Sequence, residues 1–331
     1  MIIDQRNPRK FVFGDFFVTK IFKPRFLNQI LQTMKTALLI LSFIAFATIS
    51  LVKPKKPITT LSQMKKTLGD GYAYVPSGNL LMDDDTVSVQ GFFMLRAEVS
   101  NFHYREFLFS LKQAGKLDEY QAALPDTTAW RQKLAYNEKY VEYYFNHPAY
   151  REYPVVNITK AQAEQYCKWL TQIWREKTGN NEIIFRLPYR AEFLKAAYGN
   201  SLKRPYAWDS PYLLNEKGQP NCNFLNIGAG AITRDSITGA LKIATSDFDA
   251  LYQNMGPHAD LMAPVKSYLP NEFNIYNLNG NVSEMIIDGN TAVGGNWNSP
   301  GYDVRNESTL TFLKANPMVG FRPVMTFVEK K

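Results

Sequence analysis

The chain has 331 residues, of which 45% are hydrophobic and 14% aromatic, so it can form a large folded core and is not a disordered chain. Its formal net charge is +8, but the basic excess lies in the first 56 residues and the remaining charges are mixed in sign, which argues against a nucleic-acid-binding surface. Only two cysteines are present, Cys167 and Cys222, which excludes a small scaffold held together by disulfides.

The N-terminal region predicts targeting to a membrane. An uncharged apolar run over residues 36–52 follows Met34 and Lys35, and lysines flank both of its ends. The run is slightly short for a membrane-spanning helix, which needs roughly 20 residues, and slightly long for a signal-peptide core of roughly 7–15 residues. We interpret residues 1–33 as an extension upstream of the true start. Residues 34–52 are then a signal peptide cleaved near Ala47 or, alternatively, an uncleaved membrane anchor.

The segment after the apolar run is basic and contains prolines, so residues 53–70 are predicted to be a linker and residues 71–331 the folded domain. No cysteine directly follows the apolar run, so a lipid attached to a cysteine is not expected. These features predict that the domain is exported to the periplasm and lies close to a membrane, to which residues 36–52 would anchor it if they are not cleaved.

The start of the domain carries strand and helix signals. Residues 74–75 begin a short strand, and alternating apolar residues at 87–95 predict another. Ser100 is a suitable N-cap for a helix that reaches about Gln113, with Gly115 just past its end.

The middle of the domain combines an aromatic segment with a strong helix signal. Residues 117–153 are rich in tyrosine without a helical period, which predicts an ordered excursion packed on the core. Thr159 and Gln162 then form a capping-box pattern, and apolar side chains follow at helical spacing. Cys167 lies on that apolar face and is expected to be a buried small hydrophobe.

Four motifs occur in order in the second half of the chain. Residues 185–199 read FRLPYRAEFLKAAYG, residues 276–284 read YNLNGNVSE, and GGNW and GFR follow at 294–297 and 320–322. This order resembles the formylglycine-generating-enzyme or sulfatase-modifying-factor family. The resemblance implies an α+β fold, with a C-type-lectin-like core and little regular secondary structure.

The segment at 125–170 is similar to an insertion found in gliding-motility and type IX secretion lipoproteins that use this fold. Those proteins are not known as catalysts and belong to a ring beneath the outer membrane. The resemblance therefore implies envelope proteins as partners, in a secretion or gliding assembly, and the periphery of the outer membrane as the alternative location to the periplasm.

Catalytic members of the family carry two cysteines just after the GGNW step. The resemblance places Ser299 and Val304 at those positions, and no cysteine lies between residues 223 and 331. A copper(I) site of the family type needs soft thiolate ligands, which serine and valine do not supply. The chain is therefore expected not to catalyse the family reaction.

The same resemblance implies a structural calcium site at Asn277, Gly280, Val282 and Glu284. Side-chain oxygens would come from the asparagine and the glutamate, and carbonyl oxygens from the two residues between them. From the residues alone, the segment is better interpreted as a turn in which asparagine and glycine favour positive φ, with Glu284 solvated.

Three functions follow from these observations. The first is a non-catalytic envelope protein that uses the fold as an interaction module in a type IX secretion or gliding-motility assembly. The second is a divergent metal-dependent oxidase or hydroxylase of the same superfamily. The third is a glycan-binding module, since tyrosine-rich surfaces suit stacking on sugars and contacts with proteins.

Overall fold

The structure is a computed structural model that describes Gln32 and residues 60–131, 137–225, 232–234, 236–239, 241–243 and 261–327. The chain divides into two units, Met1–Lys55 and Lys56–Lys331, and the fold below is that of the second unit. Apart from Gln32, the predicted extension at 1–33 and the predicted signal or anchor at 34–52 lie outside the described residues. Within the described part of the chain, no helix is long and apolar enough to span a bilayer.

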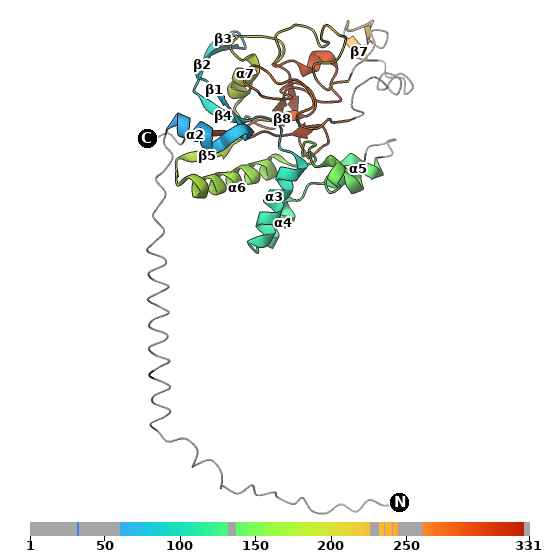
Figure 1. The fold of residues 1–331 in the computed structure, drawn as a ribbon. Helices are drawn as coiled ribbons and strands as arrows, with labels where there is room; N and C mark the ends of the chain where they lie inside the picture. The colour runs from blue at the N-terminus through green and yellow to red at the C-terminus, as the bar shows by residue number, and fades with distance from the viewer. Residues whose placement is uncertain are drawn as a thin grey trace, which may run out of the picture. The chain divides into compact units, whose positions relative to one another are not determined.

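A four-stranded antiparallel sheet separates two hydrophobic clusters (Figure 1). Its strands in spatial order are β1 (Tyr72–Val75), β4 (Phe92–Leu95), β12 (Val324–Phe327) and β5 (Ile183–Arg186). Because side chains alternate along a strand, Phe93 joins one cluster while Phe92 and Met94 join the other. Since β12 lies between β4 and β5, the sheet ties the start of the domain to its end.

The strand predicted at 87–95 is divided in the structure. Strands β2 (Gly78–Met82) and β3 (Asp85–Val89) form a separate hairpin, and β4 begins only at Phe92. Between them, a Cβ atom on Gly91 would lie 2.5 Å from the Tyr74 Oη. Residues 90 and 91 are thus outside any strand, at a close approach to Tyr74, and the prediction of one continuous strand is wrong.

A second small sheet organises the C-terminal motifs. Its strands in spatial order are β10 (Thr309–Thr311), β9 (Thr291–Val293), β8 (Ser283–Met285) and β11 (Val319–Gly320). The pair β8–β11 is parallel, with Glu284 opposite Gly320. The end of the YNLNGNVSE motif thus lies directly beside the GFR motif. A further hairpin consists of β6 (Ile232–Arg234) and β7 (Leu241–Ile243).

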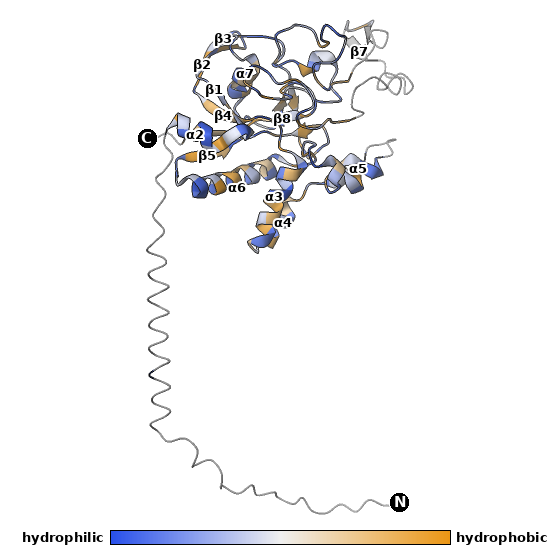
Figure 2. Cartoon of the chain, in the orientation of Figure 1, coloured by the Kyte–Doolittle hydropathy of each residue, from blue (hydrophilic) through white to orange (hydrophobic). Residues whose placement is uncertain are grey.

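The helix predicted at Ser100 is confirmed as α3 (Asn101–Gln113), with the Ser100 side chain accepting from the His103 amide. The capping box at Thr159 is confirmed as well, and it opens α6 (Lys160–Thr178). In Figure 1, α6 runs beneath β5, with α3 and α4 (Leu117–Ala123) on its other side. Figure 2 shows hydrophobic and hydrophilic bands along α6, as expected for a helix buried on one face.

The folded unit begins before residue 71. Residues of the predicted linker form α2 (Leu61–Leu68), whose N-cap Thr60 accepts from the Gln63 amide. Met64 and Leu68 are buried in the larger hydrophobic cluster. The predicted boundary at 71 therefore falls inside the fold, while residues 53–59 lie outside the described residues.

The aromatic excursion is packed on the core, as predicted. It contains α4, the short 3₁₀ helices η2 (Thr127–Trp130) and η3 (Pro148–Tyr150), and α5 (Glu138–Tyr143). Trp130 and Tyr144 are buried in a cluster that also contains Val282 of the YNLNGNVSE motif. On the other face of the sheet, α7 (Arg190–Tyr198) packs on the β2–β3 hairpin. The fold is α+β with modest regular secondary structure, as expected.

Candidate functional site

The YNLNGNVSE motif forms a tight, buried turn that leads into β8. Asn277, Gly280 and Asn281 all have positive φ, at 51°, 72° and 60°. Asparagine tolerates this region and glycine occupies it without steric cost. At Gly280 a Cβ atom would also lie 2.2 Å from the carbonyl oxygen of Asn223, so two chain segments approach each other closely there.

The turn delivers Glu284 to a buried ion pair with Arg322. The exposed fractions of the two side chains are 1% and 0%. Arg322 Nε donates to Glu284 Oε2 at 2.9 Å, and its Nη2 donates to Oε1 of the same carboxylate. The guanidinium also donates to the carbonyl oxygens of Leu95 at 3.2 Å and Tyr276 at 2.7 Å. Arg322 therefore joins β4, β8 and the turn, and its paired hydrogen bonds are those that a buried carboxylate requires.

A second buried carboxyl group lies beside this pair. Glu98 is 1% exposed; Asn281 Nδ2 donates to its Oε1 at 2.9 Å, and Asn277 Nδ2 donates to its Oε2 at 3.3 Å. The pKa of Glu98 is raised to about 8 in the folded chain. Burial is the main cause; the charge of Arg322 opposes this shift, and the charge of Glu284 adds to it. Folding therefore favours the protonated form of Glu98, next to the ion pair of Glu284 and Arg322.

The four residues of the predicted calcium site are not arranged as a free ligand set. The carboxylate of Glu284 is engaged by Arg322, and burial raises its pKa. Val282 is buried in the aromatic cluster, while Asn277 Oδ1 is buried without a hydrogen-bond partner. Among the two side chains of the predicted site, the Asn277 oxygen still needs a partner, whereas calcium would have to compete with a guanidinium for Glu284. Calcium at this turn stays a prediction.

Ser299 and Val304, which are expected to correspond to the two cysteines of catalytic family members, lie close to the same turn. The Ser299 Oγ accepts from the Asn296 amide at 3.1 Å. Val304 is fully buried, in a cluster with Tyr206, Cys222 and Phe224. The Ser299 hydroxyl is thus hydrogen-bonded to the local backbone, and the Val304 side chain has no ligand atom.

The structure also reveals something that the sequence analysis missed, a thiol in this region. Cys222 belongs to the Val304 cluster because the chain before Leu225 runs beside residues 299–300. The Leu225 amide donates to the Ser299 carbonyl at 2.9 Å. Burial raises the pKa of the Cys222 thiol, which is therefore protonated and a weak ligand at neutral pH. Within the described residues, no three His, Cys, Asp or Glu side chains are grouped to hold a metal ion.

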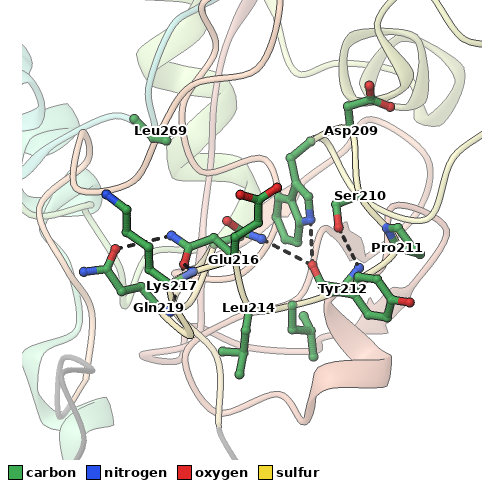
Figure 3. Close-up of a pocket in the computed structure, with 13 residues that line it drawn as sticks. Asp209, Ser210, Pro211, Tyr212, Leu214, Glu216, Lys217, Gln219 and Leu269 are labelled. Carbon is green, nitrogen blue, oxygen red and sulfur yellow. Dashed lines mark hydrogen bonds between the residues drawn. The ribbon is translucent and has the colours of Figure 1, made fainter.

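An open cavity of about 1090 Å³ borders this cluster (Figure 3). Trp208 and Leu213 line it and also pack against the buried residues around Val304. The Trp208 ring stacks on Tyr206 with 4.7 Å between ring centroids, and its Nε1 donates to the Tyr212 carbonyl at 2.9 Å. Figure 3 shows Glu216, Lys217 and Gln219 on one side of the cavity and Ser210, Pro211 and Tyr212 on the other. Aromatic, amide and charged groups thus surround one opening.

Comparison with known proteins gave a family and a set of similar structures. The profile of the sulfatase-modifying factor enzyme 1-like domain matches residues 58–326. No curated protein sequence matches the chain. PvdO from Pseudomonas aeruginosa is 17% identical with a TM-score of 0.48, over 83% of this chain and 99% of that one. CarF is 16% identical with a TM-score of 0.47, over 78% and 98% of the two chains. Treponema denticola variable protein 1 is 14% identical with a TM-score of 0.45, over 76% and 94%.

Proposed function

Because the chain belongs to the sulfatase-modifying factor enzyme 1-like family, we propose that it uses this fold as a non-catalytic interaction module at the cell envelope. The observation that carries the proposal is the chemistry at the two expected cysteine positions. Val304 is an apolar core residue there, and the Ser299 hydroxyl is engaged by a backbone amide. The nearby Cys222 is a single, buried and protonated thiol, whereas a copper(I) site of the family type needs two thiolates.

The helices α3 and α4 offer the surface for such interactions. Both pack against α6, and Figure 1 shows them projecting away from the central sheet. Phe109 on α3 and Leu117 on α4 are 62% and 58% exposed. Large apolar side chains that remain in water on neighbouring helices favour a protein partner.

The setting that we propose is an envelope assembly of the type IX secretion or gliding-motility kind. Its support is the resemblance of residues 125–170 to proteins of that class and the apolar run at 36–52. In the described parts of this segment, Trp130 and Tyr144 are buried against the fold, which gives these parts a defined surface that a partner could recognise. The partners would be envelope proteins, and the chain would remain close to a membrane.

Native electrophoresis of gently solubilised envelopes tests this proposal. The native chain is expected in the envelope fraction, in a complex larger than a monomer. The double variant Phe109→Ser, Leu117→Ser is expected to lose the complex but remain folded, since both side chains are exposed. Leu313→Ser is the matched control, because Leu313 is also exposed, at 88%, but lies elsewhere in the fold. A native chain that is monomeric and found in the cytoplasmic fraction would contradict the proposal.

A second candidate function is favoured by the cavity of Figure 3. Trp208 supplies an aromatic face, and Asn215, Gln219 and Asn221 supply amide groups around the same opening. Aromatic stacking combined with amide hydrogen bonds is the chemistry that binds neutral sugars. Binding to a panel of immobilised glycans tests it. Glycan binding by the native chain that is lost in Trp208→Ala would support this function. If the native chain binds no glycan of the panel, the cavity does not have this function.

A further inference from the structure

A separate cleft of about 540 Å³ lies between the end of α2, the central sheet and the loop at 272–274. Lys65 and Lys66 line it from α2, Arg96 lines it from the end of β4, and Tyr72 and Tyr74 line it from β1. It shares no lining residue with the cavity of Figure 3. Its basic and aromatic residues are therefore not part of the region around Ser299 and Val304.

Arg96 is the residue in this cleft that needs an explanation. Its backbone is fixed on both sides, because its amide donates to the Gly71 carbonyl at 3.0 Å and its carbonyl accepts from Tyr276 at 2.7 Å. Its side-chain Nε is nevertheless buried without a hydrogen-bond partner. Among the described residues, no carboxylate forms an ion pair with Arg96. A buried donor without a hydrogen-bond partner destabilises the fold, so the position is explained if a bound group supplies acceptors to this guanidinium.

The two lysines add positive charge at the same opening. Lys65 Nζ lies 4.3 Å from the centroid of the Tyr74 ring, which holds the ammonium group against the aromatic wall. Lysines in the last turn of a helix also stabilise its C-terminal end, and this is a sufficient structural reason for Lys65 and Lys66. It does not explain Arg96, which lies outside the helix.

The acidic residues of the cleft do not cancel this charge. Glu272 lines the cleft, but its carboxylate pairs with Arg204 at 3.0 Å and accepts from the backbone amide of Asn200 at 3.0 Å. Asp70 is the remaining carboxylate in the lining, and it is exposed. Three cationic side chains therefore face one acidic side chain that has no pair of its own among the described residues.

We propose that this cleft binds a phosphate group carried on an organic molecule. Arginine suits phosphate because its guanidinium presents several donors in a fixed plane, and lysines add charge around it. The half-buried Tyr72 and Tyr74, which line the cleft from β1, would contact the organic part. The phosphate comes either from a soluble phosphomonoester or from the headgroup of an anionic phospholipid, since both present the same group.

Thermal melting of the full-length chain with glycerol 3-phosphate tests the site. The phosphate is expected to raise the melting temperature above that in sodium chloride of equal ionic strength. Arg96→Gln is expected to weaken the affinity at least tenfold. The double variant Lys65→Gln, Lys66→Gln is expected to weaken it as well, without loss of folding, since both lysines are exposed. Lys112→Gln, an exposed lysine in the last turn of α3, is expected to bind like the native chain.

Two further outcomes distinguish the source of the phosphate and the role of Arg96. If vesicles that contain phosphatidylglycerol bind the native chain more tightly than Arg96→Gln, and phosphatidylcholine vesicles do not, the ligand is a lipid headgroup. If only the soluble phosphate distinguishes the two chains, the ligand is a soluble phosphomonoester. No response of the native chain to either probe overturns the proposal. An Arg96→Gln chain that is less stable than the native chain without phosphate also overturns it, because Arg96 would then have a structural role.

Discussion

Replacing Glu98 by glutamine tests whether this buried carboxyl group carries a proton in the folded chain. Glutamine has almost the same shape and keeps an acceptor for Asn281 Nδ2, which donates to Glu98 at 2.9 Å. Its amide nitrogen can also donate to Asn277 Oδ1, which has no partner, after the Asn277 amide turns over. The variant should therefore fold like the native chain while it lacks the titrating group.

The structure sets both the sign and the scale of the expected effect. The pKa of Glu98 rises from its ordinary value of 4.5 to about 8 on folding. Between these two values the folded chain holds one more proton than the unfolded chain. The stabilisation is therefore complete below the unfolded pKa and is lost as the pH rises through the folded pKa. In that window the free energy of unfolding falls by about 1.4 kcal/mol per pH unit, or a few kcal/mol in total.

Urea denaturation between about pH 5 and about pH 8 measures this effect, because the linkage applies directly to the free energy of unfolding. The stability of Glu98→Gln relative to the native chain is expected to increase with pH across the window. Glu119→Gln is the matched control, since Glu119 lies on the surface in an exposed ion pair with Lys116 and should show no such trend. A difference between Glu98→Gln and the native chain that stays constant with pH would refute the reasoning.

Three more predictions concern the same buried region. Arg322→Met leaves Glu284 buried without its partner, so urea denaturation should show a loss of about 3–5 kcal/mol, and a loss within error would contradict the ion pair's role. Gly280→Ala should lower the melting temperature more than Gly218→Ala. Both glycines have positive φ, but the new Cβ would meet the carbonyl oxygen of Asn223 at Gly280 and no atom within 4 Å at Gly218. If calcium binds the turn, the native chain should melt at a higher temperature in millimolar calcium than in chelator, whereas Glu284→Gln should melt at the same temperature in both. At a calcium concentration a hundredfold above Kd, the free energy of unfolding of the native chain should rise by about 2.7 kcal/mol. Identical melting temperatures of the native chain in calcium and in chelator would show that the turn binds no calcium.

The helices could be predicted from the sequence because their signals are local. Ser100 and Thr159 accept hydrogen bonds from amides three residues ahead, and both helices begin where this pattern places them. The helix at 61–68 carries a similar signal, with Thr60 as its N-cap and Gly69 just past its end. It was missed because its lysines and the prolines before it resemble a linker.

The buried polar cluster could not be predicted, because its partners are far apart in the chain. Arg322 pairs with Glu284, which lies 38 residues earlier in the chain and is placed beside it by the parallel β8–β11 pairing. Glu192 pairs with Arg186, and a separation of six residues matches neither helix nor strand spacing, so the sequence does not predict this contact. Glu307 pairs with Lys203, which is far away in the sequence.

The region around the expected cysteine positions shows the same limit. The alignment of motifs identifies Ser299 and Val304, but it gives no sign that Cys222 packs beside Val304. That contact depends on the bridge between Leu225 and Pro300, a pairing of residues 75 positions apart with no strand pattern of its own. Only the folded chain shows that a thiol is present there and that it is buried.

The most direct test of a non-catalytic role is to incubate the purified full-length chain with a sulfatase-type cysteine peptide, with and without copper(I), and to follow the peptide thiol. The double variant Ser299→Cys, Val304→Cys serves as the comparison, since it restores soft ligands at both positions and should gain measurable copper(I) affinity. For the native chain, the thiol is expected to persist equally under both conditions. Loss of the peptide thiol that depends on both copper and the native chain would contradict the proposed function.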